Sequence, residues 1–245
     1  MATRIGIDVG GTFTDFILTR DGASPLLHKV LSTPADPSIA VVEGLVELGA
    51  MVDPARSVEQ FAASIDTIVH GTTVTTNATL TGTGAKSALI TTEGVRDALE
   101  MRRGIREEQY NNAYTNVKPL VPRYLRIGVP GRLDRAGREL TPLSLADVRG
   151  ALELFLENGV QAVSICCMNS FANPAHERAA AALVREMMPD AYLTVSSELL
   201  PAIRFYDRLS TTALNSYVGP KLNHYLEQLV NRLRGIRFGG LLLIL

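Results

Sequence analysis

A glycine pair that directly follows a short apolar strand constrains this chain more than any other feature. The stretch Ile5–Asp15 reads IGIDVGGTFTD, with apolar residues before Gly10 and Gly11 and a second strand signal after them. Two adjacent glycines can take backbone angles that are closed to other residues, so their N–H groups can point together toward one anion. The hydroxyls of Thr12 and Thr14 add donors. The stretch therefore predicts a β-hairpin whose tip binds phosphate.

Asp8, at the end of the first predicted strand, suggests a metal ligand. An unpaired buried carboxylate is costly, so an aspartate within an apolar strand argues against an ordinary hairpin that merely has glycines at its tip. Carboxylate oxygens are suitable ligands for hydrated Mg²⁺. We therefore expect Asp8 to hold Mg²⁺ against the phosphates that the hairpin binds.

Two better-known glycine patterns do not fit this sequence. A dinucleotide-binding fingerprint needs G-x-G-x-x-G leading into a helix, whereas here a second strand follows the glycine pair. Residues 82–87, GTGAKS, have some likeness to a Walker sequence, but Ala85 separates the last glycine from Lys86 and a strand pattern follows. We interpret this segment as a turn before a strand.

A second polar stretch, His70–Asn77 (HGTTVTTN), follows a predicted strand and opens a predicted helix. The N–H groups of the first helical turn, with Thr72 or Thr73 as the cap, would form another anion site. His70 is interpreted either as a general acid/base near neutral pH or as a residue that orients a threonine. Each residue alone also fits ordinary helix capping or a simple hydrogen bond, so the combination of polar residues carries the interpretation.

Composition excludes several classes of protein. The 245 residues are 46% hydrophobic and 20% charged with a formal net charge of −1, which is a globular composition without the basic field that nucleic-acid binding needs. Neither a signal-peptide pattern nor an apolar run of about twenty residues is found, which predicts a cytoplasmic protein that does not enter a membrane. Cys166 and Cys167 are adjacent in an apolar strand pattern and are expected to be packing residues.

The order of predicted elements indicates an α/β fold. Three strand patterns in residues 4–31 precede a helix that starts at Asp36, and a further strand is predicted at residues 65–70. This is the opening order of the ribonuclease-H-like fold of actin-like ATPases, a mixed sheet flanked by helices. The phosphate hairpin would lie at the first turn of that fold.

Beyond residue 100 we expect an irregular insertion at residues 101–143, near the cleft, because prolines interrupt regular structure there. Within it, Arg102 and Arg103 either clamp a phosphate or carboxylate or belong to a solvated, ion-paired surface. Helices and strands then resume. A long helix is predicted at residues 218–233, and residues 237–245 look like the first part of a buried strand.

Four motifs, in order along the chain, resemble the hydantoinase A/5-oxoprolinase family. They are DVGGTFTD at residues 8–15, HGTT and Asn77 at residues 70–77, SFANPAHE at residues 170–177, and SSE at residues 196–198 followed by LP and STT at residues 200–212. The resemblance covers about residues 4–220. The family includes ATP-dependent hydantoinase, 5-oxoprolinase and caprolactamase subunits, together with subunits of acetone and acetophenone carboxylases.

The resemblance implies an actin-like ATPase subunit that uses ATP and Mg²⁺ to phosphorylate the carbonyl oxygen of a small cyclic amide, such as a hydantoin or 5-oxoproline, so that the ring can be hydrolysed. It implies a larger hydantoinase B-type partner subunit in an oligomer. Catalytic roles fall to Asp8, His70 and Thr73, with Asp8 as the metal ligand. Cofactor binding falls to the other residues of the two loops, which are Gly10, Gly11, Thr12, Thr14, Gly71, Thr72 and Asn77.

Two other functions are compatible with the same motifs. One is a subunit of an ATP-dependent ketone carboxylase, and the other is a nucleotide-binding assembly subunit without catalysis. The resemblance also implies an N-terminal actin-like domain at residues 1–200 and an incomplete main domain that starts at residue 201. Family members continue for several hundred residues and carry a second glycine-rich phosphate loop. We therefore expect a truncated chain, a gene fragment or half of a split enzyme, with the second actin-like half incomplete.

Overall fold

The computed structural model describes residues 2–104 and 107–245, and the chain forms two compact units. The first unit combines the chain up to Thr83 with Lys221–Leu245, and the second unit is Gly84–Pro220. The second unit is therefore inserted into the sequence of the first. These units reflect packing within the chain, and the family-domain boundary expected near residue 200 stays a prediction.

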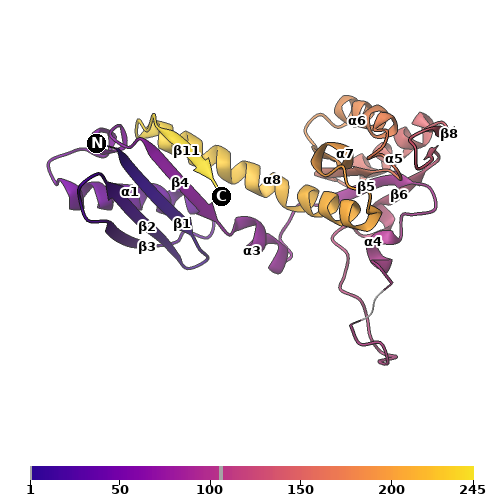
Figure 1. The fold of residues 1–245 in the computed structure, drawn as a ribbon, viewed down its shortest axis with the longest axis horizontal. Helices are drawn as coiled ribbons and strands as arrows, with labels where there is room; N and C mark the ends of the chain where they lie inside the picture. Colours follow the sequence, from indigo (N-terminus) through magenta and orange to yellow (C-terminus); the bar gives the residue numbers. More distant parts are fainter. Residues whose placement is uncertain (1, 105–106) are drawn as a thin grey trace. The chain divides into compact units, whose positions relative to one another are not determined.

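A five-stranded mixed sheet forms the first unit, with the strand order β11-β4-β1-β2-β3 (Figure 1). Its strands are β1 (Thr3–Val9), β2 (Phe13–Arg20), β3 (Leu26–Leu31), β4 (Thr67–Thr72) and β11 (Leu241–Ile244). The first three strands are antiparallel neighbours, whereas β4 is parallel to both β1 and β11. The predicted mixed sheet with its opening hairpin is confirmed.

Two helices cover one face of this sheet, α1 (Pro37–Val52) and the C-terminal part of α8 (Phe205–Gly235) (Figure 1). Asp36 caps α1, since its side chain accepts a hydrogen bond from the N–H of Ser38, and a proline occupies the first helical turn. Two short helices, α2 (Val58–Ala62) and α3 (Val74–Leu80), precede and follow β4 in the sequence. The buried core between sheet and helices includes Ile5, Ile7, Val9, Phe16, Ile68, Leu45, Leu48, Leu229 and Leu233.

The opposite face of the sheet, here called the open face, presents exposed side chains. Leu27 of β3 is 70% exposed and Leu243 of β11 is 44% exposed. Successive side chains of a strand point to opposite faces, so the buried Ile7 and Val9 place the intervening Asp8 on the open face. One face of β1 therefore belongs to the core, and the other carries the carboxylate.

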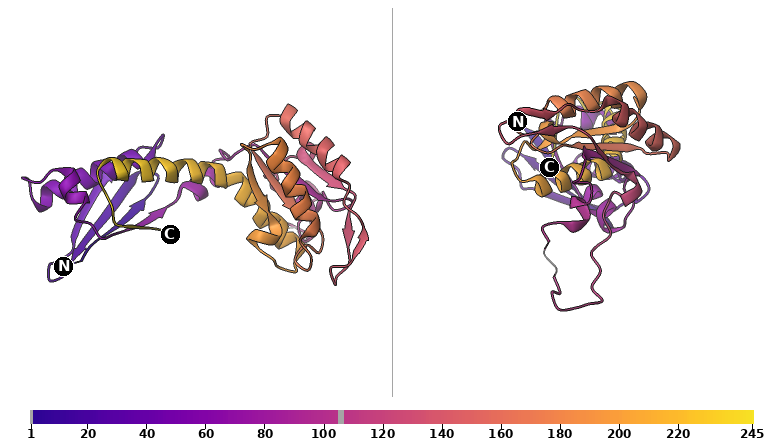
Figure 2. Two further views of the ribbon diagram at one scale, coloured as in Figure 1. Left: turned by 90° about the horizontal axis from the view of Figure 1, so that it is seen from above. Right: turned by 90° about the vertical axis from the view of Figure 1, so that its right-hand side faces the viewer.

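A four-stranded parallel sheet forms the second unit, with the strand order β10-β9-β5-β6. Its strands are β5 (Ser87–Thr92), β6 (Arg126–Val129), β9 (Ala162–Cys166) and β10 (Tyr192–Val195). The helices α5 (Leu145–Glu157) and α6 (Ala175–Met187) lie side by side against it (Figure 2). The remaining elements are α4 (Ala98–Met101), η1 (Arg123–Leu125), β7 (Arg132–Leu133), β8 (Glu139–Thr141) and α7 (Ser196–Leu199).

Several sequence-based expectations can be compared with these elements. Cys166 and Cys167 are buried in the core of the second unit, as expected for packing residues. The predicted start of the long helix at residue 218 is wrong, because α8 already begins at Phe205. The stretch expected to be irregular contains β6, which pairs with β5. Residues 105–106 of that stretch lie outside the described residues. None of the described helices is both long and apolar enough to cross a membrane.

Candidate functional site

The predicted phosphate hairpin forms between β1 and β2. The N–H of Gly10 donates to the carbonyl oxygen of Phe13 at 3.0 Å and closes the turn. The N–H groups of Gly11 and Thr12 donate no hydrogen bond to the described residues. The tip of the hairpin therefore offers two adjacent donors to a ligand, while the donor of Gly10 is already used.

The expected backbone reason for the glycine pair is wrong. Positive φ angles occur at other glycines of the described chain, and neither Gly10 nor Gly11 has one. Close approach explains Gly10 better, because a Cβ atom built there would lie 3.1 Å from the carbonyl oxygen of Phe13. A side chain at this position would therefore press on the turn itself.

Thr14 lies inside the hairpin and does not face its tip. The residue is fully buried, and its Oγ1 is 3.0 Å from Oγ of Ser32. Ser32 in turn donates to the carbonyl oxygen of Gly10 at 2.9 Å. The Thr14 hydroxyl thus joins β2 to the turn through Ser32. Of the two threonines, it is Thr12 that is exposed at the tip.

One pocket, here called the hairpin pocket, adjoins the tip of the hairpin. It has a volume of about 540 Å³ and is lined by residues of the hairpin, α3 and α8. Five of the predicted site residues meet there, namely Gly10, Gly11, Thr12, Thr73 and Asn77. The α8 residues Lys221, His224, Tyr225 and Gln228 also line it. A pocket of this size accommodates a small organic ligand.

Of the two threonines expected to cap α3, it is Thr72 whose hydroxyl accepts a hydrogen bond from the helix. Thr73 occupies the N-cap position, but its Oγ1 donates to the carbonyl oxygen of Val9 at 3.2 Å and makes no cap hydrogen bond. The N–H of Val74 instead donates to Oγ1 of Thr72 at 3.3 Å. Asn77 Nδ2 donates to Oγ1 of Thr73 at 3.3 Å. Thr73 therefore links α3 to the end of β1.

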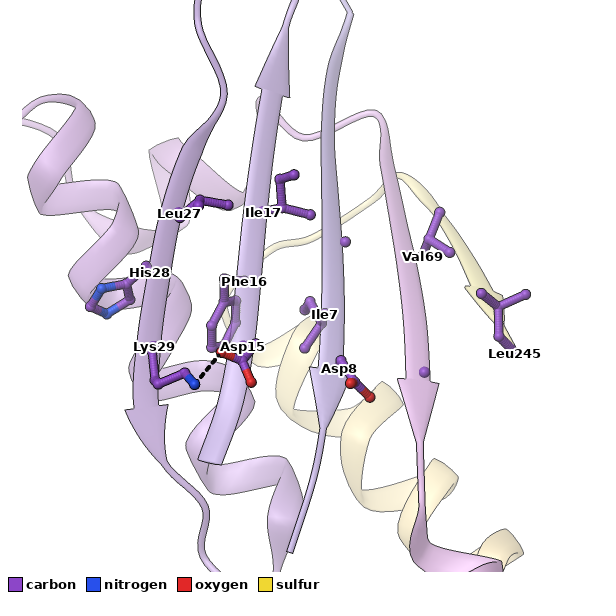
Figure 3. A pocket seen from close by; sticks show the side chains of 12 residues that line it. Ile7, Asp8, Asp15, Phe16, Ile17, Leu27, His28, Lys29, Val69 and Leu245 are labelled. Atoms are coloured by element: carbon purple, nitrogen blue, oxygen red, sulfur yellow. Dashed lines mark ion pairs between the residues drawn. The ribbon is translucent and has the colours of Figure 1, made fainter. Parts of the chain in front are cut away.

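Asp8 lies on the open face, between residues of the two neighbouring strands. It pairs with Asp15 of β2 on one side and with Gly71 of β4 on the other. Figure 3 shows the Asp8 and Asp15 carboxylates on neighbouring strands and the ion pair of Lys29 with Asp15, whose Nζ–Oδ1 distance is 2.9 Å. These residues line an open-face pocket of about 780 Å³. A Cβ atom built at Gly71 would lie 3.5 Å from Asp8 Oδ1, so the glycine leaves the carboxylate accessible.

His70 lies in the core and lines neither pocket. Its imidazole is fully buried, and Nε2 is 2.7 Å from the hydroxyl of Tyr225, while Nδ1 has no partner among the described residues. Burial lowers the pKa of His70 to about 4 and raises the pKa of Tyr225 above its usual range. A general acid/base role near neutral pH does not fit a buried, neutral imidazole. A role in orienting the Tyr225 side chain does fit this imidazole.

The four α8 residues of the hairpin pocket were missed by sequence reasoning, namely Lys221, His224, Tyr225 and Gln228. Their only local signal is a helical spacing of three and four residues. The same spacing occurs on the solvent-exposed face of any helix, so it does not indicate a binding site. The two arginines that were considered as clamps are ion-paired instead, Arg102 with Glu107 at 2.6 Å and Arg103 with Asp207 at 2.5 Å.

The motif at residues 170–177 organises the second unit. Its Glu177 is fully buried and accepts hydrogen bonds from the N–H of Cys167 at 2.7 Å, the hydroxyl of Ser196 at 2.6 Å and the N–H of Ser197 at 2.8 Å. His176 Nε2 is 2.8 Å from Oε2 of Glu139. These contacts give His176 and Glu177 a structural role in the second unit.

Comparisons with known proteins agree on one family. A model of the hydantoinase/oxoprolinase N-terminal region matches residues 4–188. The chain is 40% identical over 228 residues to the caprolactamase subunit alpha of Pseudomonas jessenii, covering 92% of this chain and 32% of that protein. It is 34% identical over 254 residues to the acetophenone carboxylase gamma subunit of Aromatoleum aromaticum, covering 98% of this chain and 34% of that protein.

A solved structure also matches this fold. The crystal structure of ATP-dependent caprolactamase from Pseudomonas jessenii superposes with a TM-score of 0.88 at 39% identity, covering 96% of this chain and 34% of that chain. The chain thus spans about a third of the length of these relatives.

Proposed function

Since the chain belongs to the hydantoinase/oxoprolinase family, we propose that it supplies the phosphate-binding part of an ATP-dependent hydrolase that opens a cyclic amide. The observation that carries the proposal lies at the end of β1. There the exposed carboxylate of Asp8 lies two residues before Gly10, in whose turn Gly11 and Thr12 keep their N–H groups unpaired among the described residues. Identity of 40% with a caprolactamase subunit supports the substrate class.

A cyclic amide resists water because its nitrogen lone pair is delocalised onto the carbonyl group. In the proposed reaction the carbonyl oxygen bonds to the γ-phosphorus of ATP, the bond from that phosphorus to the ADP oxygen breaks, and the amide proton is lost. Water then adds to the activated carbon, the ring C–N bond breaks, and the nitrogen takes up a proton. A second water releases phosphate from the resulting acyl phosphate. The products are the ring-opened amino acid, ADP and phosphate.

The protein's part in such a transfer is positioning and charge stabilisation. In our proposal the N–H groups of Gly11 and Thr12 and the Thr12 hydroxyl bind phosphate oxygens. Thr73 and Asn77 bind the ligand from the α3 side of the same pocket. Thr14 and Thr72 hold the loops in shape through their own hydrogen bonds. His70 positions Tyr225 rather than transferring a proton.

The residues at the end of β1 fit a divalent cation. Asp8 is exposed, makes no ion pair with the described residues, and stands beside Gly71, where a Cβ atom would approach its Oδ1 to 3.5 Å. Hard cations such as Mg²⁺ take carboxylate and phosphate oxygens. In our proposal Asp8 would therefore hold Mg²⁺, and the chemistry that the ion would supply is neutralisation of phosphate charge.

A second candidate function is the ATP-dependent carboxylation of a ketone. It is favoured by 34% identity to the acetophenone carboxylase gamma subunit over 98% of this chain. Phosphorylation of an enolised ketone oxygen needs the same phosphate-binding groups, so the site described above serves both reactions. Both relatives are named as subunits, and we propose that this chain likewise acts in an oligomer with a B-type partner subunit.

The two candidates are separated by the substrate that stimulates ATP turnover. The chain, with its B-type partner, would be supplied with ATP, Mg²⁺ and either a cyclic amide or acetophenone with bicarbonate, and ADP release would be measured. We expect caprolactam, hydantoin or 5-oxoproline to stimulate ADP release and to yield the ring-opened acid. Stimulation by the ketone and bicarbonate alone would support the carboxylase, and stimulation by neither would contradict both.

A further inference from the structure

The hairpin pocket carries positive charge without a counter-charge. Its lining includes Lys221 of α8, and none of its lining residues is Asp or Glu. Nζ of Lys221 donates to Oγ1 of Thr83 at 2.9 Å. No described carboxylate lies within the 4.0 Å that defines an ion pair with this ammonium group. A lysine held only by a neutral hydroxyl is available to an anionic ligand.

The position of Lys221 on α8 is fixed by the fold. Lys221, His224 and Gln228 are three and four residues apart, so they share one face of the helix, and all three line the pocket. Between them, the buried Tyr225 anchors α8 to β4 through its 2.7 Å hydrogen bond to His70. The polar face of α8 is therefore oriented by a core contact and does not depend on the pocket's contents.

The hairpin side of the same pocket offers hydrogen-bond donors to a ligand at its tip. The N–H groups of Gly11 and Thr12 have no partner among the described residues. A lysine on one side and two backbone donors on the other suit a ligand with several anionic oxygens. Phosphate is such a ligand, whereas the ring of caprolactam is neutral and offers a single carbonyl acceptor.

We propose that Lys221 is an anion-binding residue that contacts a phosphate group in the hairpin pocket. The inference rests on the proposed function and extends it, because Lys221 lies outside the matched residues 4–188 and outside both predicted loops. Two sources share this chemistry, namely the phosphates of the nucleotide and the phosphoryl group after its transfer. The contact places a cation on the α8 side of the hairpin tip, whereas Asp8 lies on the open face.

The test is calorimetric titration of the full chain with pyrophosphate in the absence of Mg²⁺, so that Asp8 and its metal play no part. We expect Lys221→Met to weaken pyrophosphate binding by about tenfold or more, as for the loss of a charged hydrogen bond, and Lys221→Arg to restore most of the affinity. Lys86→Met is the matched control, because it also removes one positive charge but Lys86 bonds to the Asn158 carbonyl in the second unit. Thermal melting of each variant checks that the fold is intact.

Unchanged pyrophosphate affinity in Lys221→Met, an equal loss in Lys86→Met, or no binding by the unaltered chain would overturn the inference. Loss with ATP, ADP and pyrophosphate alike would support a contact to the nucleotide, and loss with pyrophosphate and inorganic phosphate but not with ATP or ADP would support a contact to the transferred group. Failure of the proposed function has a different signature. In that case pyrophosphate binding would still depend on Lys221, but Mg-ATP would bind no better than pyrophosphate and neither substrate class would stimulate turnover.

Discussion

Asp8 lies directly opposite Asp15 in the antiparallel pairing of β1 and β2, and both carboxylates project onto the open face. Like charges at opposed positions destabilise a sheet. Lys29 pairs with Asp15 at 2.9 Å, and among the described residues no cation pairs with Asp8. The arrangement leaves one carboxylate at the strand end without a counter-charge, which supports the metal-binding role that we propose for Asp8.

Gly71→Ala tests the space beside that carboxylate. The new Cβ would lie 3.5 Å from Asp8 Oδ1, which is an ordinary contact for the fold but obstructs a ligand of the carboxylate. We expect an unchanged melting temperature and about tenfold weaker binding of Mg-ATP, equivalent to about 1.4 kcal/mol. Titration with ATP without Mg²⁺ is the control and should be unaffected. Equal Mg-ATP affinity in the variant would argue against a metal at this position.

The buried His70 predicts a specific dependence of stability on pH. Burial lowers its pKa from 6.5 to about 4, so between these values the unfolded chain binds a proton that the folded chain does not. The stabilisation is therefore fully present above pH 6.5 and is lost as the pH falls toward 4, by about 3 kcal/mol in total. Urea denaturation at several pH values would measure it.

His70→Gln is the control for this pH dependence, because its amide can still reach Tyr225 but does not titrate. The difference in free energy of unfolding between the original chain and the variant should shrink as the pH is lowered from 6.5 to 4. Parallel curves for the two proteins would show that His70 is not the group responsible.

Packing of α1 on β2 is tested by a pair of glycine substitutions. A Cβ atom at Gly44 would lie 2.2 Å from Cζ of Phe16, inside the core, whereas one at Gly150 of α5 meets nothing within 4 Å. We expect Gly44→Ala to lower the free energy of unfolding by about 3 kcal/mol through overpacking. Gly150→Ala should raise it by up to about 1 kcal/mol, because alanine favours a helix. Chemical denaturation would measure the free energy of unfolding of both variants. A Gly44→Ala variant as stable as Gly150→Ala would contradict this account of the packing.

Glu177 predicts a large effect in the second unit. Its buried carboxylate accepts three hydrogen bonds, two of them from backbone N–H groups. In Glu177→Gln one oxygen becomes an NH₂ group that faces a donor, and we expect a loss of about 3 kcal/mol in the free energy of unfolding. Glu153→Gln, at an exposed position of α5, is the matched control and should change stability by less than about 0.5 kcal/mol. Similar values for both variants would contradict the role of Glu177.

The parts of the fold that the sequence predicts are those with local signals. The β1–β2 hairpin follows from strand patterns around a glycine pair, and the start of α1 follows from Asp36 before a proline. The start of α8 was missed, because the helix was predicted to begin only at residue 218, after the polar residues Ser210–Thr212. Within the helix, however, Oγ1 of Thr212 donates to the carbonyl oxygen of Arg208 at 2.7 Å, which keeps the hydroxyl satisfied.

The candidate site is only partly predictable for a different reason. Gly11, Thr12, Thr73 and Asn77 meet in one pocket because the two loops follow neighbouring parallel strands. Lys221 reaches the same pocket through a chain segment of 137 residues, Gly84–Pro220, that forms its own unit. No local pattern encodes such a contact. Likewise, only the packed core shows that His70 is buried against Tyr225.

The central claim, that the end of β1 binds a magnesium nucleotide, is tested most directly by comparing Mg-ATP affinity of the original chain and Asp8→Asn by calorimetry. Asn keeps the size of the exposed side chain, so the fold should be retained. We predict that the original chain binds ATP more tightly with Mg²⁺ than without it, and that Asp8→Asn loses this difference while still binding pyrophosphate. Full retention of the Mg²⁺-dependent affinity in Asp8→Asn would contradict the proposed site.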